Sequence, residues 1–467
     1  MSALSKKNTA TSTATHRTFY QTLLKLAIPV TIQNVLMSSL NLVDTLMIGQ
    51  LGAVEVAAVG QANRFFFVFL LLVFAISSGT AIFTAQYWGK KDVEHIGKVM
   101  AIALFVNLAV SIFFWFGGVF FPGAIMKIFT NDASIMTEGI VYLRIVAWSY
   151  PLTAVTIIYA FVLRSIEQVT LPMYASVTAL STNTLLNYCL IFGHFGLPAL
   201  GVKGAAIATL IARIIEMMLL GLLTYRKQCP TVRWEDLHRI PPSLVKQFCI
   251  TTLPVVVNEF AWVMGVTVYA VVYGRMGTAE VAAVNMIGPV EQLASSVFFG
   301  VANASATMIG NQIGARDEDT AFSYAKRFLL FGPLVSIGIG GIVWQSAPLI
   351  VSIFHVPQGV RTLAVYILYV FSAVIWIKIF NLICVVGVLR GGGDTKYSMY
   401  MEMIAIWGVG VPLALLGGFI WKLAVYWVFA LVQIEELFKM LVGLHRILSQ
   451  KWIHNLVSSG ESDRNLS

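Results

Sequence analysis

Long apolar stretches recur along this chain from end to end, and they constrain its fold more than any other feature. One of them runs from Pro29 to Gly49 with Asp44 as its only ionisable side chain. A helix of about 20 apolar residues is long enough to cross the roughly 30 Å hydrocarbon core of a bilayer. Hydrophobic residues fill 58% of the 467 positions and charged residues only 11%. The sequence therefore predicts an all-α polytopic membrane protein rather than a soluble one.

The apolar stretches predict twelve transmembrane helices. Lys and Arg gather in the loops on one side of these spans, and the positive-inside rule places that side, with both termini, in the cytoplasm. We therefore expect a multi-pass protein of the cell membrane. The predicted spans are 22–48, 54–83, 97–121, 137–163, 171–193, 201–224, 246–273, 279–308, 324–350, 362–389, 396–419 and 422–446.

The two halves of the chain are repeats. At a constant offset of 225 residues, Pro29 aligns with Pro254, and EVAAV at 55–59 aligns with EVAAV at 280–284. Loop residues keep the same phase, which chance similarity between apolar helices does not explain. The predicted layout is a mobile cytoplasmic tail at 1–21, a six-helix lobe at 22–224, a cytoplasmic linker at 225–245, a second six-helix lobe at 246–446 and a cytoplasmic tail at 447–467.

The even number of spans per repeat fixes how the repeats are related. Six spans return the chain to its starting side, so both halves begin in the cytoplasm and are parallel repeats about an axis along the membrane normal. This arrangement predicts a V-shaped two-lobe transporter with a central cleft. Rocking of the lobes would open that cleft to each side of the membrane in turn.

Several other classes of protein do not fit the sequence. The net charge of +9 is spread over short loops rather than gathered in one basic domain with stacking aromatics, so nucleic-acid binding is not expected. The four cysteines show no metal-ligand spacing, so neither a disulfide nor a metal centre is predicted. No HExxH or GxSxG motif occurs, and LRGGGDTK at Leu389 lacks the ending of a phosphate-binding loop. We expect neither an enzyme nor a cofactor.

Several motifs, in order, resemble the multidrug and toxic compound extrusion (MATE) family over essentially the whole chain after the tail. They are VDTLMIGQLG at Val43, LGVKGAAIAT at Leu200, LPV at Leu253 and LRGGGDTK at Leu389. The resemblance implies a secondary active multidrug efflux antiporter. Such a protein exports organic, often cationic or amphipathic, compounds in exchange for H⁺ or Na⁺ by alternating access.

Asp44 is the residue most expected to do this work. A carboxylate inside a span costs about 2.5 to 3.5 kcal/mol on insertion scales, so it is rare without a partner or a watery cavity. Asn183 and Asn187 lie at i, i+4 on one face of a later span, and Thr209 follows in the next one. Amide and hydroxyl groups can coordinate a small cation beside the carboxylate, or stabilise the carboxylate when the cation leaves. The family's first-lobe cation site resembles this set, so H⁺ or Na⁺ is expected at Asp44; the alternative is that the polar residues only join helices.

A second group of candidates belongs to the second half. Glu259 and Lys378 each lie about midway along a span, which predicts an ion pair with either a structural role or a role in binding an organic cation. Tyr269 aligns with Asp44 in the repeat. The NorM-type branch of the family implies an acid near Trp262 and another near Ile379, and this chain has neither, so its second-lobe sodium site is not expected here.

Other charged residues of the spans are expected to be structural. Those nearer span ends can extend their side chains to the headgroups. This group comprises Arg64, Arg144, Arg213, Glu216, Glu291 and Glu402. Glu435 and Glu436 are expected to be solvated near the cytoplasmic end of the last span.

The expected partners are small-molecule drugs or toxic metabolites and the lipid bilayer, and we expect a monomer. A flippase for a lipid-linked precursor remains an alternative function. Such a protein should line its cleft with several cationic residues to hold a pyrophosphate, whereas the candidates here are Lys378 and, nearer the span ends, Arg64 or Arg144.

Overall fold

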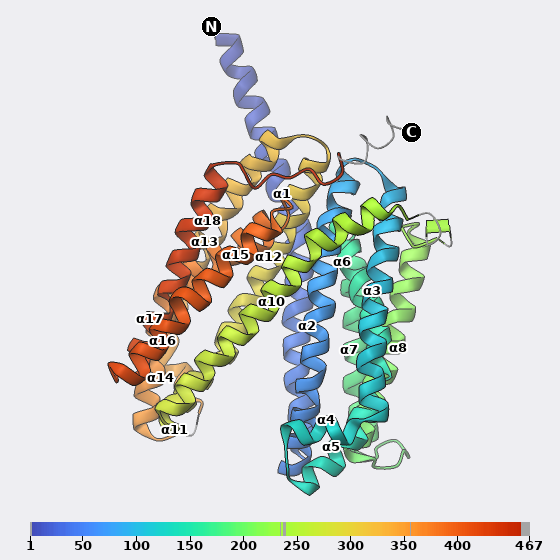
Figure 1. The fold of residues 1–467 in the computed structure, drawn as a ribbon, viewed down its shortest axis with the longest axis vertical. Helices are drawn as coiled ribbons and strands as arrows, with labels where there is room; N and C mark the ends of the chain where they lie inside the picture. Colours follow the sequence, from blue (N-terminus) through green and yellow to red (C-terminus); the bar gives the residue numbers. More distant parts are fainter. Residues whose placement is uncertain (1, 234, 237–239, 355, 459–467) are drawn as a thin grey trace. The chain divides into compact units, whose positions relative to one another are not determined.

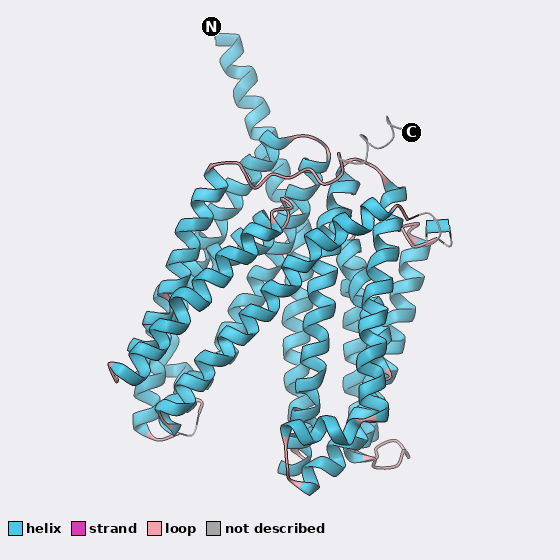
Figure 2. Ribbon diagram, viewed as in Figure 1, coloured by secondary structure: helices cyan, strands magenta, loops and turns pink. Residues whose placement is uncertain are grey.

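The computed structural model describes residues 2–233, 235–236, 240–354 and 356–458. Within these ranges the chain consists of helices and loops, without strands (Figure 2). The first half contains eight helices in the order of Figure 1. They are α1 (Ser2–Gly49), α2 (Ala53–Gly89), α3 (Val93–Phe120), α4 (Pro122–Phe129), α5 (Ala133–Val146), α6 (Ser149–Ser165), α7 (Thr170–Phe192) and α8 (Gly201–Arg226).

The second half follows the same plan with more irregular helices. Three segments, η1 to η3, have π-helical hydrogen bonding, which is rare in proteins and occurs mostly as single turns within longer helices. The elements are α10 (Pro242–Met276), α11 (Thr278–Asn285), α12 (Gly288–Gly314), α13 (Glu318–Ser352), α14 (Gln358–Leu382), η1 (Ile383–Leu389), α15 (Thr395–Met403), η2 (Ile404–Gly410), α16 (Val411–Leu415), η3 (Leu416–Ile420), α17 (Val425–Val432) and α18 (Ile434–Leu448).

The all-α membrane fold is confirmed. In the described part of the chain, nine helices are long and apolar enough to cross a membrane, or ten if the pair α5–α6, bent by 52°, counts as one span. The two other predicted spans are helical but fall outside this set: α7, and the pair α17–α18. α7 contains Asn183 and Asn187, and α18 contains Glu435, Glu436 and Lys439. α7 thus carries two of the candidate site residues, whereas α17 with 8 residues and α18 with 15 are each too short to cross a membrane alone.

The bend between α5 and α6 has a local cause. Pro151 has no N–H to donate to the carbonyl of Ala147, which a regular helix would require. That carbonyl instead accepts from the N–H of Tyr150 at 3.0 Å, and the N–H of Trp148 bonds to Ile145 at 3.2 Å. These tighter bonds end one helix and start the next in a new direction.

The helices form two compact units, which we describe separately. One unit contains residues 32–256, and the other contains residues 1–31 together with 257–467. The two boundaries, after Thr31 and after Val256, are 225 residues apart (256 − 31 = 225), so they fall at equivalent positions of the repeat. Each lies two residues after a proline within a helix, Pro29 in α1 and Pro254 in α10. The first helix of each repeat thus contributes to both units.

The core of unit 32–256 is apolar and aromatic. Phe69 and Tyr150 are fully buried and stack with their ring centroids 4.8 Å apart, beside Phe66 and Phe114. Aromatic pairs in this arrangement add about 0.5 to 1.5 kcal/mol beyond the area they bury. The core therefore gives the helices around it a fixed framework.

Helices α7 and α8 approach closely at Gly204. A Cβ atom there would lie 2.4 Å from the carbonyl oxygen of Leu190, which already accepts the N–H of Leu200 at 2.8 Å. We expect Gly204→Ala to destabilise the protein by about 1 to 3 kcal/mol, because backbone rather than a flexible side chain must move. Gly221→Ala is a matched control in the same helix, since no atom lies within 4 Å of its Cβ position. Thermal unfolding in detergent measures both, and equal midpoints for the two variants would contradict the proposed close contact.

Candidate functional site

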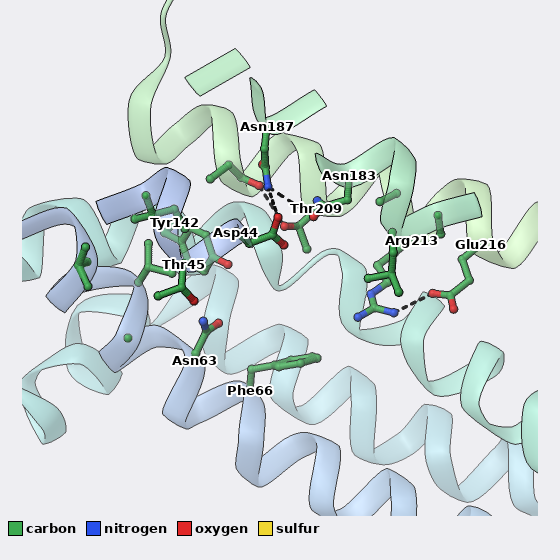
Figure 3. A pocket seen from close by; sticks show the side chains of 18 residues that line it. Asp44, Thr45, Asn63, Phe66, Tyr142, Asn183, Asn187, Thr209, Arg213 and Glu216 are labelled. Carbon is green, nitrogen blue, oxygen red and sulfur yellow. Dashed lines mark hydrogen bonds and ion pairs between the residues drawn. The ribbon is translucent and has the colours of Figure 1, made fainter. Parts of the chain in front are cut away.

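A cavity of about 440 Å³ lies among helices of unit 32–256 (Figure 3). Its size falls within the range of ordinary small-ligand sites. Side chains from α1, α2, α5, α7 and α8 line it. The lining residues are Asp44, Thr45, Ile48, Val56, Val59, Gly60, Asn63, Phe66, Tyr142, Ala179, Leu180, Asn183, Asn187, Ala205, Thr209, Ala212, Arg213 and Glu216. Asp44 and the three residues predicted around it, Asn183, Asn187 and Thr209, are all among them.

Two amides hold the carboxylate of Asp44. The Asn187 Nδ2 donates to Asp44 Oδ1 at 2.9 Å. Asn183 is assigned with its amide nitrogen toward Asp44, because the opposite orientation sets its oxygen against the carboxylate. In this assignment the nitrogen donates to Asp44 Oδ2 at 2.8 Å, and the oxygen accepts from the backbone N–H of Thr209 at 3.2 Å. Each carboxylate oxygen therefore has one amide donor, and Asp44 still faces the cavity.

The spacing of the polar residues explains why they meet. Asn183 and Asn187 are four residues apart on α7, and both are buried. Thr209 lies on α8, which packs along α7 (Figure 1). The Thr209 Oγ1 donates to the carbonyl of Ala205 at 3.0 Å, within its own helix, and Thr209 is one of the residues that line the cavity. Side chains of three helices thus converge on one carboxylate.

Sequence reasoning missed two charged residues of this cavity. Arg213 and Glu216 were expected to extend toward headgroups, and that prediction is wrong because both line the cavity with Asp44. Arg213 NH1 lies 2.7 Å from Glu216 Oε2, and Glu216 is only 4% exposed. The signal was present in the spacing, since Arg213 follows Thr209 by one helical turn and so lies on the same face of α8.

The predicted ion pair between Glu259 and Lys378 is also wrong. Glu259 on α10 pairs with Arg390 at 2.8 Å. Lys378 on α14 pairs with Glu291 at the start of α12. Both pairs lie within the unit of residues 257–467. Similar depth in the membrane did not identify the partner, because depth leaves open which faces of the helices point at each other.

The other two candidates of the second half, Tyr269 and Trp262, do not share a site. Tyr269 is buried and donates its hydroxyl hydrogen to Glu435. Lys439 Nζ lies 3.5 Å from Glu435 Oε1 and 2.9 Å from Glu436 Oε1. Glu435 was expected to be solvated, but it is buried, because its helix turns this face toward other helices of the unit. Trp262 is 43% exposed and takes no part in these contacts.

The LRGGGDTK motif packs against the segment that follows α18. A Cβ on Gly392 would lie 2.3 Å from the ring of Trp452, which is fully buried, so only glycine leaves room for this ring. Asp394 Oδ2 accepts from Arg446 Nε at 2.7 Å. Burial raises the pKa of Asp394, but hydrogen bonds from His454 and Arg446 and the charge of Arg446 outweigh it, so the pKa lies below its ordinary value. The motif therefore serves packing in this part of the chain.

Comparison with known proteins gives the family. The family model MatE matches residues 29–189 and 254–416, two segments that begin at the equivalent prolines of the repeat. A probable multidrug resistance protein NorM from Thermotoga maritima is 25% identical over 464 residues, which cover 95% of this chain and 95% of that protein. The transporter YisQ from Bacillus subtilis is 24% identical over 430 residues, covering 88% of this chain and 90% of that one.

Solved structures share the fold. A MATE crystal structure in the bent conformation gives a TM-score of 0.84 at 17% identity, covering 93% of this chain and 96% of that chain. A transporter of the MOP superfamily from Pyrococcus furiosus gives 0.81 at 18% identity, covering 92% and 96%. At these identities the likeness establishes the fold alone. Because the family model matches both repeats over most of the chain, the protein belongs to the MatE family of multidrug and toxic compound extrusion transporters, and it is a transporter rather than an enzyme.

Proposed function

We propose that the protein is a secondary active antiporter that exports organic, often cationic or amphipathic, compounds in exchange for H⁺ or Na⁺ bound at Asp44. The observation that carries this proposal is a carboxylate on a membrane-spanning helix that faces a cavity with an amide donor on each oxygen. An acid in a membrane span costs free energy, so it is rare, and where it occurs it usually marks a functional site. Amide oxygens and a hydroxyl beside it are suitable ligands for Na⁺, and their hydrogens can stabilise the carboxylate once the ion leaves.

The charges around the cavity favour one monovalent ion. Asp44 and Glu216 each carry a negative charge, and Arg213 carries a positive one. The net charge of these three groups is therefore −1 when both acids are ionised, and a single Na⁺ or proton neutralises it. An ion that binds one arrangement of the transporter more tightly than the other shifts the population between them, and this difference in affinity drives the exchange.

The alternative reading of the asparagines is that they only join helices. Interhelical hydrogen bonds of this kind are worth about 0.6 kcal/mol on average in membrane proteins. That gain is smaller than the cost of placing Asp44 in the span. The coupling function explains why an acid is present at all, whereas helix joining needs only the amides.

The remaining proposals concern substrates and setting. Relatives such as PmpM from Pseudomonas aeruginosa are named multidrug resistance proteins, and they support small-molecule drugs or toxic metabolites as substrates. We further propose a monomer in the cell membrane with both termini in the cytoplasm, as the distribution of Lys and Arg indicates. A flippase would need several free cations to hold a pyrophosphate. In the described lining of the cavity the cationic residue is Arg213, which is already paired with Glu216.

Export by purified protein in liposomes tests this function. A sodium gradient and a proton gradient are imposed separately, and export of ethidium, a flat organic cation, is followed by fluorescence. We expect one of the two gradients to drive export and an ionophore that dissipates it to stop export. Equal ethidium movement with and without both gradients, or movement of a labelled lipid-linked pyrophosphate in place of ethidium, would contradict antiport.

A further inference from the structure

A permanently charged guanidinium in a cation cavity calls for an explanation. Arginine side chains carry a positive charge at all ordinary pH values, and Arg213 lines the same cavity as Asp44. A fixed positive charge beside the carboxylate weakens the binding of any second cation. In the present arrangement this charge is taken up by Glu216, whose Oε2 lies 2.7 Å from Arg213 NH1.

Glu216 is held in place from its other side. Its Oε1 accepts from the hydroxyl of Ser176 at 2.7 Å, and that hydroxyl accepts from Gln33 Nε2 at 2.8 Å. The Gln33 Oε1 in turn accepts from Arg164 NH2 at 2.8 Å. This chain of hydrogen bonds connects α8, α7, α1 and α6, so the carboxylate of Glu216 is a fixed point of the unit.

Arg213, by contrast, can move. Its side chain is 25% exposed against 5% for that of Glu216, and it faces the open cavity (Figure 3). It stands one turn along α8 from Thr209, whose backbone N–H meets the amide that holds Asp44. An arginine has a long side chain with several rotatable bonds, so its guanidinium can take up different positions within the cavity. The guanidinium of Arg213 therefore has two carboxylates in the same cavity with which it could pair, those of Glu216 and Asp44.

We propose that Arg213 is the resident counter-ion of the cavity: it pairs with Glu216 while a coupling ion occupies Asp44, and it turns to Asp44 when that ion leaves. This inference rests on the proposed function of Asp44. An emptied Asp44 would otherwise be an uncompensated charge within the membrane, which is costly. By taking the place of the ion, Arg213 assists its release and keeps the emptied carboxylate paired. Arg213 is thus a positioning residue that sets the affinity for the coupling ion.

The proposal predicts opposite effects for the two partners of one salt bridge. In Arg213→Gln, the guanidinium that competes with the coupling ion for Asp44 is gone. The half-saturating concentration of the ion should therefore fall by at least about fivefold, the low end of ordinary coupling between sites. In Glu216→Gln, Arg213 is released toward Asp44, so the same concentration should rise by at least about fivefold. A salt bridge whose two charges stay in place would also shift the single variants in opposite directions, but removing both charges together would leave ion binding nearly unchanged.

Binding of Na⁺ and of protons to the full chain in detergent supplies the readout, without any transported drug. The described titratable side chains that line the cavity are Asp44 on α1, Tyr142 on α5 and Arg213 and Glu216 on α8, so Asp44→Asn identifies the share of binding due to Asp44. Arg213→Lys keeps the charge and should stay close to the unchanged protein. The double variant Arg213→Gln/Glu216→Gln removes both charges of the salt bridge and with them the guanidinium that competes with the ion for Asp44, so it should bind the ion more tightly than the unchanged protein.

The outcomes separate this inference from the proposed function. If Asp44→Asn leaves ion binding unchanged, the function proposed for Asp44 fails. If Asp44→Asn removes binding while Arg213→Gln and Glu216→Gln shift it in the same direction, the function stands and the counter-ion role of Arg213 is refuted. Unchanged or weaker binding by the double variant would refute it as well, and this variant stays informative if Arg213→Gln alone does not fold.

Discussion

Replacing Asp44 by Asn is expected to reduce ion-driven export to the level of protein-free liposomes. Asn keeps the size and much of the hydrogen bonding of Asp, but it can neither take up a proton nor neutralise Na⁺. The amide donors of Asn183 and Asn187 would then face a neutral group. Because the ion no longer distinguishes the two arrangements of the transporter, its gradient can no longer shift their populations.

The measurement is the initial rate of ethidium export from liposomes under the gradient that drives the unchanged protein. Glu94→Gln is the control, since it also removes an acid from the unit of residues 32–256. Glu94 lies at the exposed start of α3 and pairs with Lys98 at 2.6 Å, a surface contact of small energetic value. Full export by Asp44→Asn, with the same ion dependence as the unchanged protein, would remove Asp44 from the mechanism.

Asp44 and the amides beside it could be predicted because local rules place them. Asp44 is conspicuous in an apolar span, and the spacing of Asn183 and Asn187 puts both on one face of α7. The same regularity made the repeat visible, and the unit boundaries in α1 and α10 obey its offset of 225 residues. Features that depend on one helix, or on a constant shift along the chain, are therefore accessible from the sequence.

The ion pairs between different helices could not be predicted, because each depends on which helix faces which. Glu259 and Lys378 have similar depths, yet Glu259 meets Arg390 and Lys378 meets Glu291. Glu216 was expected at a span end, whereas the contact of α7 with α8 places it beside Ser176. Long charged side chains can reach either a headgroup or a neighbouring helix, and the sequence alone does not choose between these environments.

The second large effect is expected at the Glu259–Arg390 pair. Arg390 is 3% exposed, and among the described residues its Nε and NH1 atoms have no hydrogen-bond partner. Glu259→Gln would leave this guanidinium buried without its carboxylate 2.8 Å away, which should cost about 3 to 5 kcal/mol of stability. Thermal unfolding in detergent checks this value, with Glu318→Gln at the exposed start of α13 as a control that should cost less than about 1 kcal/mol.

A double-mutant cycle separates the structural role of this pair from a role in binding organic cations. Arg390→Met alone leaves the carboxylate of Glu259 without its ion-pair partner. Glu259→Met/Arg390→Met removes both charges and should be more stable than either single variant. With a structural pair, export per folded molecule in the double variant stays near that of the unchanged protein. A double variant that folds well but no longer exports ethidium would instead show that Glu259 binds the organic cation, and a double variant no more stable than the single ones would show that the two charges do not stabilise each other.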